Sequence, residues 1–287
     1  KCNLLKELKK KEKLLVMNKR KLLVKHPNTE NKDKQIYFLC AMPRSGNTLF
    51  ASIMNQNPEV AVTANSITLE IMKELFLLKQ DDTFKNFPDE QSLDNVMNEV
   101  YNLYYKNWNH KVIIDRGPVC TPGNLKVMQR HFKQPIRCIV LVRDVLDVLA
   151  SYIKWFENEP TAFPNRYKTL DEKLSQIMHK NGAMAKELMS IQYLLQHRDM
   201  AVFVKYDDLV INPEKELRKV YSFLKLPYFP HTFTNLNQVV VNGIQYNDSI
   251  VGKNMHTIRT EKIMKVENEY KNKIPERFVK EYGHITF

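Results

Sequence analysis

The segment Pro-Arg-Ser-Gly-Asn-Thr at residues 43–48 places a cation, two hydroxyls and a glycine between an apolar run and a helical pattern. At a helix N-terminus the first amide groups have no partner within the helix, and the helix dipole makes that end partly positive. Gly46 lets the backbone approach an anion closely, and Arg44 offers a planar fork of donors that suits phosphate oxygens. Further donors come from Ser45, Asn47 and Thr48. The segment indicates an anion-binding loop; the alternative is a tight turn in which a polar side chain simply caps the helix.

This segment differs from the phosphate loop of kinases and GTPases. A Walker A sequence, G-x-x-x-x-G-K-[ST], requires a first glycine and a lysine that the segment lacks. The whole chain contains only seven glycines, so the one at this turn is informative. Adenylate-type kinases and GTPases are therefore disfavoured.

A second pair of polar residues follows the apolar run Ile136 to Val142. Arg143 stands directly after the run, and Ser151 lies eight residues later on a helical pattern. Eight residues span a little over two helical turns, so the two side chains can share a face and converge on one ligand. Taken alone the pattern is weak, because an arginine after a strand often forms a surface ion pair. Asp144 and Asp147 suit the first turn of the helix.

The elements that must position these residues alternate along the chain. Apolar runs typical of buried strands are Ile36 to Ala41, Val112 to Ile114, Ile136 to Val142 and Ala201 to Val204. Helical patterns cover residues 66–80, 91–107, 144–157 and 170–196. Continuous apolar strands separated by helices predict a three-layer α/β fold of the P-loop type, with a central parallel sheet flanked by helices. Ligands of such sheets bind beyond the carboxyl ends of the strands, where the polar residues stand.

The net charge of +12 lies mainly in a leading segment. Residues 1–25 hold ten Lys or Arg against two Glu, which is +8, so the remaining 262 residues carry only about +4. We expect no specific nucleic-acid partner. Residues 1–30 are predicted to form a basic helical arm and residues 31–287 a single domain. The arm is interpreted as solvated, with weak contact to a membrane surface through residues 1–25 as the alternative.

The spacing of the cysteines and the lengths of the apolar runs indicate whether the protein binds a metal and where it is located. No two of the four cysteines have the C-x-x-C spacing of a metal or redox site, and Cys40 and Cys138 lie in apolar runs. No clustered His, Cys or carboxylate set suggests a metal, so none is expected. No apolar run has the roughly 18 residues that a membrane span requires. We therefore expect a soluble, cytoplasmic protein in a reducing compartment.

The two polar elements together resemble a known family. A strand followed by PRSGNT, with strand-Arg143-x7-Ser151 about 95 residues on, is similar to the 5′-phosphosulfate-binding and 3′-phosphate-binding elements of sulfotransferases that use 3′-phosphoadenosine-5′-phosphosulfate (PAPS). The segment VFVKYDDLVINPEKELRKVYSFLKLP resembles a later motif of that family. The likeness covers roughly residues 36–60, 110–156 and 200–228. Arg44 places it closer to the Pro-Arg-Ser-Gly branch, which includes protein-tyrosine, carbohydrate and bacterial-type enzymes.

The resemblance implies roles for individual residues. Residues 44–48 would bind the 5′-phosphosulfate of the co-substrate PAPS, and Arg143 with Ser151 would bind its 3′-phosphate. Arg44 and the helix N-terminus would stabilise the charge on the leaving phosphate. Arg116 resembles a basic residue that touches the transferred sulfuryl group. Arg259, in the segment NGIQYNDSIVGKNMHTIRTEKI, and Tyr206 would complete the nucleotide site; the alternative for Tyr206 is a place in the core.

The general base that an acceptor hydroxyl requires is harder to find. The protein-tyrosine branch uses a glutamate near the place of residues 64–66, which read Ala-Asn-Ser, and the cytosolic branch uses a histidine that is missing after VIIDRGPVC. Asp115 is the nearest titratable group and is the predicted base; its alternative is a structural pair with Arg116. Glu70 is next in order. More distant candidates, each interpreted as a surface or loop residue, are His110, His131 and His256.

The resemblance predicts an enzyme that moves a sulfuryl group from PAPS to an acceptor hydroxyl or amine. The acceptor classes left open are a peptide tyrosine, a carbohydrate, a lipid and a small alcohol. The alternatives are a P-loop small-molecule kinase and a non-catalytic nucleotide-binding interaction protein.

Overall fold

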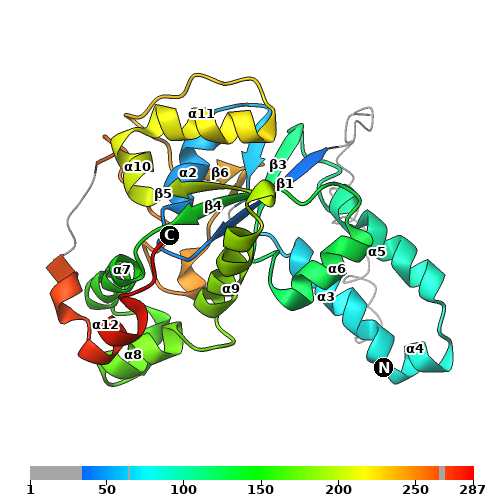
Figure 1. Ribbon diagram of the computed structural model, residues 1–287, viewed down its shortest axis with the longest axis horizontal. Coiled ribbons are helices and arrows are strands. Elements are labelled where there is room, and N and C mark those ends of the chain that lie inside the picture. The colour runs from blue at the N-terminus through cyan, green and yellow to red at the C-terminus, as the bar shows by residue number, and fades with distance from the viewer. Residues whose placement is uncertain (1–33, 64, 265–268) are drawn as a thin grey trace, which may run out of the picture. The chain divides into compact units, whose positions relative to one another are not determined.

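A sheet of five parallel strands lies at the centre of the computed structural model, which describes residues 34–63, 65–264 and 269–287 (Figure 1). The strands are β1 (Gln35–Ala41), β2 (Val60–Val62), β3 (Val112–Arg116), β4 (Cys138–Val142) and β5 (Ala201–Lys205). Their order in the sheet is β2-β3-β1-β4-β5, and all neighbours are parallel. The predicted α/β class with a central parallel sheet is confirmed. The basic arm predicted for residues 1–30 lies outside the described residues.

Four of the five strands correspond to the predicted apolar runs, and β2 was missed. β2 has only three residues, Val60–Val62, so its pattern is too short to stand out from a loop. It is a strand because it pairs with β3, where Val60 lies opposite Val112. β3 also extends two residues beyond the predicted run, so Asp115 and Arg116 belong to the strand itself.

The described residues form eleven α-helices, several of which flank the sheet. They are α2 (Asn47–Met54), α3 (Thr68–Leu77), α4 (Asp82–Asn86), α5 (Glu90–Tyr104), α6 (Pro122–His131), α7 (Val145–Asn158), α8 (Leu170–Ile177), α9 (Ala183–Gln196), α10 (Tyr206–Ile211), α11 (Pro213–Leu224) and α12 (Glu276–Tyr282). Local capping explains several starts. Asp144 accepts a hydrogen bond from the Asp147 amide at the start of α7, and Thr169 forms a capping box with Glu172 at the start of α8.

The helical pattern predicted over residues 170–196 is two helices, not one. The chain leaves α8 after Ile177 and enters α9 at Ala183, with Gly182 as the N-cap. A Cβ at Gly182 would stand 2.9 Å from the carbonyl oxygen of His179, so only glycine fits this tight turn without a shift. The break could not be predicted from the apolar spacing, because both helices pack an apolar face inward and the spacing therefore continues across the turn.

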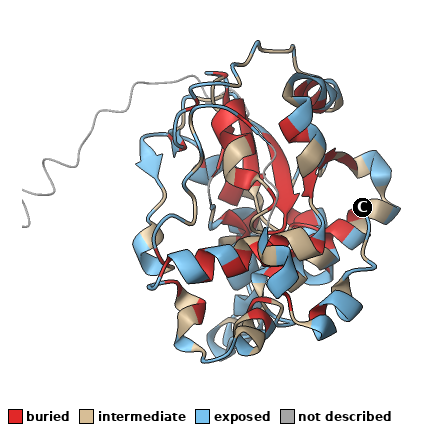
Figure 2. Cartoon of the chain, turned by 90° about the vertical axis from the view of Figure 1, so that its left-hand side faces the viewer, coloured by how far each residue is buried: buried red, intermediate tan, exposed pale blue. Residues whose placement is uncertain are grey.

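The core explains why the ends of the strands meet. Strand residues 36–41, 112–114 and 138–142 are buried. Figure 2 shows buried residues at the centre of the fold and helices around them whose outer faces are exposed. In the parallel register Leu39 lies opposite Arg116, Ala41 opposite Leu141, and Val142 opposite Lys205. The loops that follow β1, β3, β4 and β5 therefore leave the same edge of the sheet. That edge carries the polar residues.

A C-terminal segment follows α11. It contains a short antiparallel hairpin of β6 (Val240–Val241) and β7 (Ile244–Gln245), and then a 3₁₀ turn at Asp248–Ile250. Its backbone is tied to the earlier chain, since Ser52 Oγ donates to the Asn237 carbonyl. In the described residues we find no helix that is long and apolar enough to cross a membrane.

Candidate functional site

The loop between β1 and α2 has a left-handed backbone at two residues. Gly46 has φ +93° and is the N-cap of α2, and Arg44 also has a positive φ of 68°. A Cβ at Gly46 would stand 2.7 Å from the Tyr206 ring, so both conformation and space require glycine here. No side chain caps α2, and its first turn has no acidic residue. The positive end of this eight-residue helix is thus open to an anion.

Arg44 holds the loop against two other elements. Its Nε donates to Ser151 Oγ on α7 (3.1 Å), and its Nη1 donates to the Met255 carbonyl (2.6 Å). Burial lowers the pKa of Arg44, and the charge of Arg143 acts in the same direction. A guanidinium stays protonated even in this setting. A bound anion would therefore offset both the cost of burying the charge of Arg44 and its repulsion from Arg143.

Arg143 and Ser151 converge as their spacing predicted. Arg143 Nη1 donates to the Arg44 carbonyl (2.9 Å), and its guanidinium lies over the Tyr206 ring at 4.3 Å from the centroid. Ser151 contacts the same arginine from α7. Two segments about 100 residues apart in the sequence therefore meet at one loop. This arrangement differs from the surface ion pair that was the alternative for Arg143.

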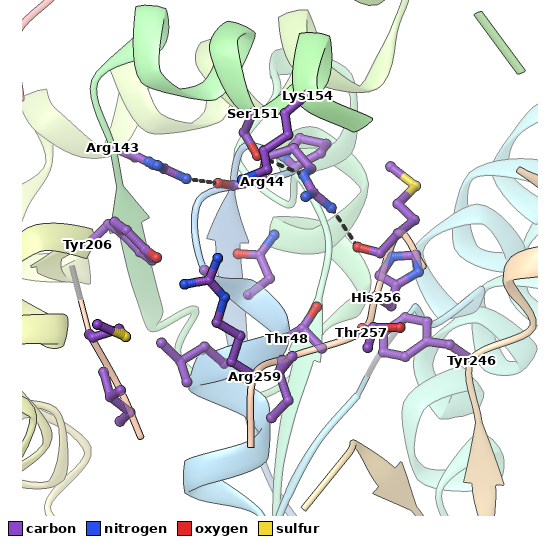
Figure 3. A pocket seen from close by; sticks show the side chains of 18 of the residues that line it. Arg44, Thr48, Arg143, Ser151, Lys154, Tyr206, Tyr246, His256, Thr257 and Arg259 are labelled. Atoms are coloured by element: carbon purple, nitrogen blue, oxygen red, sulfur yellow. Dashed lines mark hydrogen bonds between the residues drawn. The ribbon is translucent and has the colours of Figure 1, made fainter. Parts of the chain in front are cut away.

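These side chains surround one cavity of about 310 Å³, which Figure 3 shows from close by. The polar residues that line it include Arg44, Asn47, Thr48, Arg116, Arg143, Ser151, Lys154, Tyr206, Tyr246, His256 and Arg259. Arg259 thus lines the cavity from the C-terminal segment, and its contact with the nucleotide stays a prediction. Ser45 differs, because its side chain is fully buried and its Oγ has no partner among the described residues. Its amide donates to the Met42 carbonyl at 3.2 Å, so Ser45 does not line the cavity as the neighbouring Arg44 and Gly46 do.

The end of β3 separates Asp115 from Arg116. Successive strand residues point to opposite faces, so the two side chains diverge. Arg116 lines the cavity, and its Nη1 donates to Asn65 Oδ1 (2.6 Å). The predicted structural pair of Asp115 with Arg116 does not form among the described residues.

Asp115 instead lies among hydroxyl donors. It is 2% exposed and accepts hydrogen bonds from Thr63 Oγ1 (3.0 Å), Thr68 Oγ1 (2.5 Å) and Tyr105 OH (2.7 Å). Burial raises the pKa of this carboxyl, and the hydroxyls oppose the rise. Thr63 Oγ1 also accepts from the Arg116 amide, so the cluster fixes the strand end. Its role as the base stays a prediction, and this geometry favours a supporting role.

Two acidic groups near the loop escaped the sequence interpretation. Glu187 on α9 is 4% exposed and accepts the Ala41 amide at 3.2 Å. Burial raises the pKa of Glu187 to about 8, against the charge of Arg116. Asp248 pairs with His256 in the C-terminal segment. No sequence signal marks Glu187, because a glutamate in an amphipathic helix usually faces solvent.

The unpaired polar groups suit a polyanion. Arg116 Nε is buried without a partner among the described residues, and the guanidinium groups of Arg44 and Arg143 form no ion pair with a carboxylate there. We find no cluster of three metal-ligating side chains in that same part of the chain. The arrangement can hold two negatively charged groups, one at the start of α2 and one beside Arg143.

Comparison with known proteins identifies related chains. The sequence model described as "Sulfotransferase family" matches residues 37–230. No curated protein sequence matches the chain. The sulfotransferase domain from the Synechococcus PCC 7002 olefin synthase is 14% identical, with a TM-score of 0.50 over 92% of this chain and 99% of that chain. The sulfotransferase domain from the curacin biosynthetic pathway is 16% identical, with a TM-score of 0.50 over 88% and 99%. At these identities the two structures show a shared fold.

Proposed function

The chain belongs to the sulfotransferase family, and on that premise we propose that it transfers a sulfuryl group from PAPS to an acceptor hydroxyl or amine. One observation carries the proposal. Arg44 with the open N-terminus of α2, and Arg143 with Ser151, come from separate strand ends and border the same cavity. A nucleotide with a 5′-phosphosulfate and a 3′-phosphate presents anions at two places, which matches two such elements.

These contacts support an assignment of residues to the donor site. Residues 44–48 bind the 5′-phosphosulfate through the backbone amides of Gly46, Asn47 and Thr48, with Asn47 and Thr48 adding side-chain donors; the Ser45 amide is excepted, since it donates to Met42. Arg143 and Ser151 bind the 3′-phosphate, and Arg259 approaches from the C-terminal segment. The Tyr206 ring packs against both Gly46 and the Arg143 guanidinium, and so connects the two parts of the site.

The reaction places negative charge where the loop is positive. PAPS supplies a phosphate–sulfate anhydride whose cleavage leaves charge on a 5′-phosphate oxygen. Arg44 and the α2 N-terminus face that oxygen and stabilise the charge as it grows. Arg116 also lines the cavity and binds the sulfuryl oxygens. Because these groups are held by Ser151, Met255 and Asn65, little reorganisation is needed at the moment of transfer.

The acceptor is a hydroxyl compound of a class that stays open: a peptide tyrosine, a carbohydrate, a lipid or a small alcohol. The family match does not favour the two alternatives, a P-loop kinase and a non-catalytic interaction protein.

Donor titrations test the proposal. Calorimetry with 3′-phosphoadenosine 5′-phosphate (PAP) is expected to give binding in EDTA, and ATP with Mg²⁺ is expected to bind at least 10-fold more weakly. ³⁵S-labelled PAPS is then offered with a tyrosyl peptide, an oligosaccharide, a fatty alcohol and 4-nitrophenol. Absence of PAP binding, or phosphoryl transfer from ATP that depends on Mg²⁺, would refute sulfuryl transfer.

A further inference from the structure

His256 and Asp248 form an imidazole–carboxylate pair on the wall of the cavity. His256 Nδ1 lies 2.5 Å from Asp248 Oδ1, and the His256 amide donates to Asp248 Oδ2 at 2.9 Å. Both oxygens of one carboxylate thus fix the ring and the backbone of the same histidine. A carboxylate on Nδ1 favours the tautomer whose proton is on Nδ1, which leaves the Nε2 lone pair free.

The plane of the ring is fixed as well. Tyr246 stacks on His256 with ring centroids 3.9 Å apart and an angle of 2° between the planes. Tyr246 lies beside Thr48 of the anion-binding loop, so the stack is tied to the donor site. A ring held on one edge and one face can turn little, which is what a group that accepts a proton in one direction requires.

The pair lies next to the groups assigned to the sulfuryl end of the donor. Met255, the neighbour of His256, accepts the hydrogen bond of Arg44 Nη1. Figure 3 shows His256 beyond Arg44 and close to Tyr246, on the side of the cavity opposite Arg143. The histidine thus lies beside Arg44, which is assigned to the 5′-phosphosulfate, and across the cavity from Arg143.

An acceptor can reach this histidine. The side chains of His256 and Asp248 are 18% and 19% exposed, and Nε2 has no hydrogen-bond partner among the described residues. The other carboxyls near the loop differ. Asp115 is enclosed by three hydroxyl groups, and Glu187 is bonded to the backbone of Ala41 beneath the loop. Neither lines the cavity.

We propose that His256 is the general base of the transfer reaction and that Asp248 is its positioning residue. This inference rests on the proposed sulfuryl transfer. The acceptor hydroxyl donates to Nε2; as its oxygen bonds to sulfur, the bond from sulfur to the 5′-phosphate oxygen breaks and the proton passes to Nε2. PAP leaves, and the imidazolium returns the proton to water. Asp248 stabilises the imidazolium while it exists.

The charged groups around His256 set its working range. Burial, the largest cause, lowers the pKa of His256; Arg116 and Arg44 act in the same direction, and Asp248 opposes them. Lys154, Arg259 and Lys262 line the same cavity and add positive charge. The ring is therefore neutral at pH 7 and able to accept a proton. Turnover should fall on the acid side, below the ordinary histidine pKa of about 6.5.

A matched pair of histidine variants tests the proposal. His197 also stacks on a tyrosine, with 3.9 Å between its ring and that of Tyr193, and its Nδ1 contacts a backbone oxygen, but it does not line the cavity. His256→Gln is expected to lower kcat by about 10²- to 10⁴-fold, with the Kd for PAP changed less than about 3-fold. His197→Gln is expected to change neither. The acceptor is whichever compound of the panel wild type uses fastest, or water if sulfate release is the only reaction.

The Asp248→Asn variant tests whether Asp248 acts on the protonation of His256, because the pH dependence of kcat would not change if Asp248 had only a structural role. Removing its charge lowers the pKa of His256, so the acid limb of the kcat profile, and the NMR titration of the His256 ring, should both move to lower pH. Unchanged kcat in His256→Gln, or an acid limb that Asp115→Asn moves and Asp248→Asn does not, would overturn the proposal while sulfuryl transfer stands. Failure of wild type to bind PAP would overturn the transfer reaction itself.

Discussion

At the scale of single residues, donor recognition depends on arginines held by neutral partners. Arg44 and Arg143 are bonded to a serine hydroxyl and to carbonyl oxygens, none of which neutralises a guanidinium. Such groups attract an anion more strongly than arginines that already form ion pairs, because no carboxylate has to be displaced.

Arg143→Ala should separate the two phosphates of the donor. A charge-assisted contact contributes about 1.5–3 kcal/mol, so the variant should bind PAPS roughly 10- to 150-fold more weakly. Binding of adenosine 5′-phosphosulfate, which lacks the 3′-phosphate, should barely change. Arg166→Ala is the matched control, since Arg166 also lies over a tyrosine ring but away from the cavity. Equal losses for both nucleotides would contradict the assignment and point to a disturbed loop, because Arg143 also holds the Arg44 carbonyl.

Glu187→Gln should change how stability depends on pH. The pKa of Glu187 is about 8 in the folded chain, above its ordinary 4.5, so the folded state binds more protons between these values. Wild-type stability should therefore fall as pH rises from about 5 to 8, by at most about 5 kcal/mol. The variant keeps an acceptor for the Ala41 amide and loses the titration.

Thermal unfolding at pH 5 and pH 9 checks this prediction. The two proteins should have similar Tm values at pH 5, and the variant the higher Tm at pH 9. Glu74→Gln is the control, because the Glu74 side chain is 70% exposed. An equal pH dependence in wild type and Glu187→Gln would show that this carboxyl does not titrate in the window.

At the scale of elements, the site depends on the turn that connects β1 to α2. The turn requires a left-handed residue at the helix N-cap, and Tyr206 from the start of α10 packs against that residue. The turn, the ring and Arg143 form a continuous stack, so a change in one displaces the others.

Gly46→Ala should therefore affect binding beyond its backbone strain. Gly243 has a similar φ of +74° but open space where a Cβ would stand, so Gly243→Ala carries the strain without the collision. A left-handed non-glycine residue costs about 1 kcal/mol. Both variants should lose that stability, and only Gly46→Ala should weaken PAP binding more than about 10-fold. Similar affinities in calorimetry would mean that Tyr206 moves aside freely.

At the scale of the whole molecule, the charge excess and the site are in different parts of the sequence. Residues 1–25 carry +8 of the net +12, whereas the family match and the described residues that line the cavity begin after residue 36. A long-range role for the arm in attracting an anionic donor would depend on salt, since exposed charges are screened within about 10 Å at 0.1 M.

Deletion of residues 1–25 should leave the chemistry intact. We expect kcat and the Kd for PAP within about 2-fold of the full chain at 0.15 M salt, because the family match begins at residue 37 and the described residues that line the cavity begin at Pro43. Steady-state kinetics and calorimetry on both chains provide the check. Loss of PAP binding in the shortened chain would place part of the arm in the site.

The sequence by itself determined the parts whose signal is local. The fold class follows from apolar runs separated by helical patterns, and the β1–α2 loop follows from the unusual order of its residues. Arg143 and Ser151 were found because eight helical residues return to one face. Their convergence on Arg44 agrees with that reasoning.

Only the tertiary structure decided which titratable groups face the cavity. Asp115 and Arg116 are adjacent in sequence, yet one is enclosed by hydroxyls and the other lines the site, because strand residues alternate between faces. His256 looked like an ordinary loop histidine until Asp248, Tyr246 and the Arg44–Met255 contact were placed around it. Proton affinity and accessibility depend on neighbours distant in the chain, and a local pattern does not contain them.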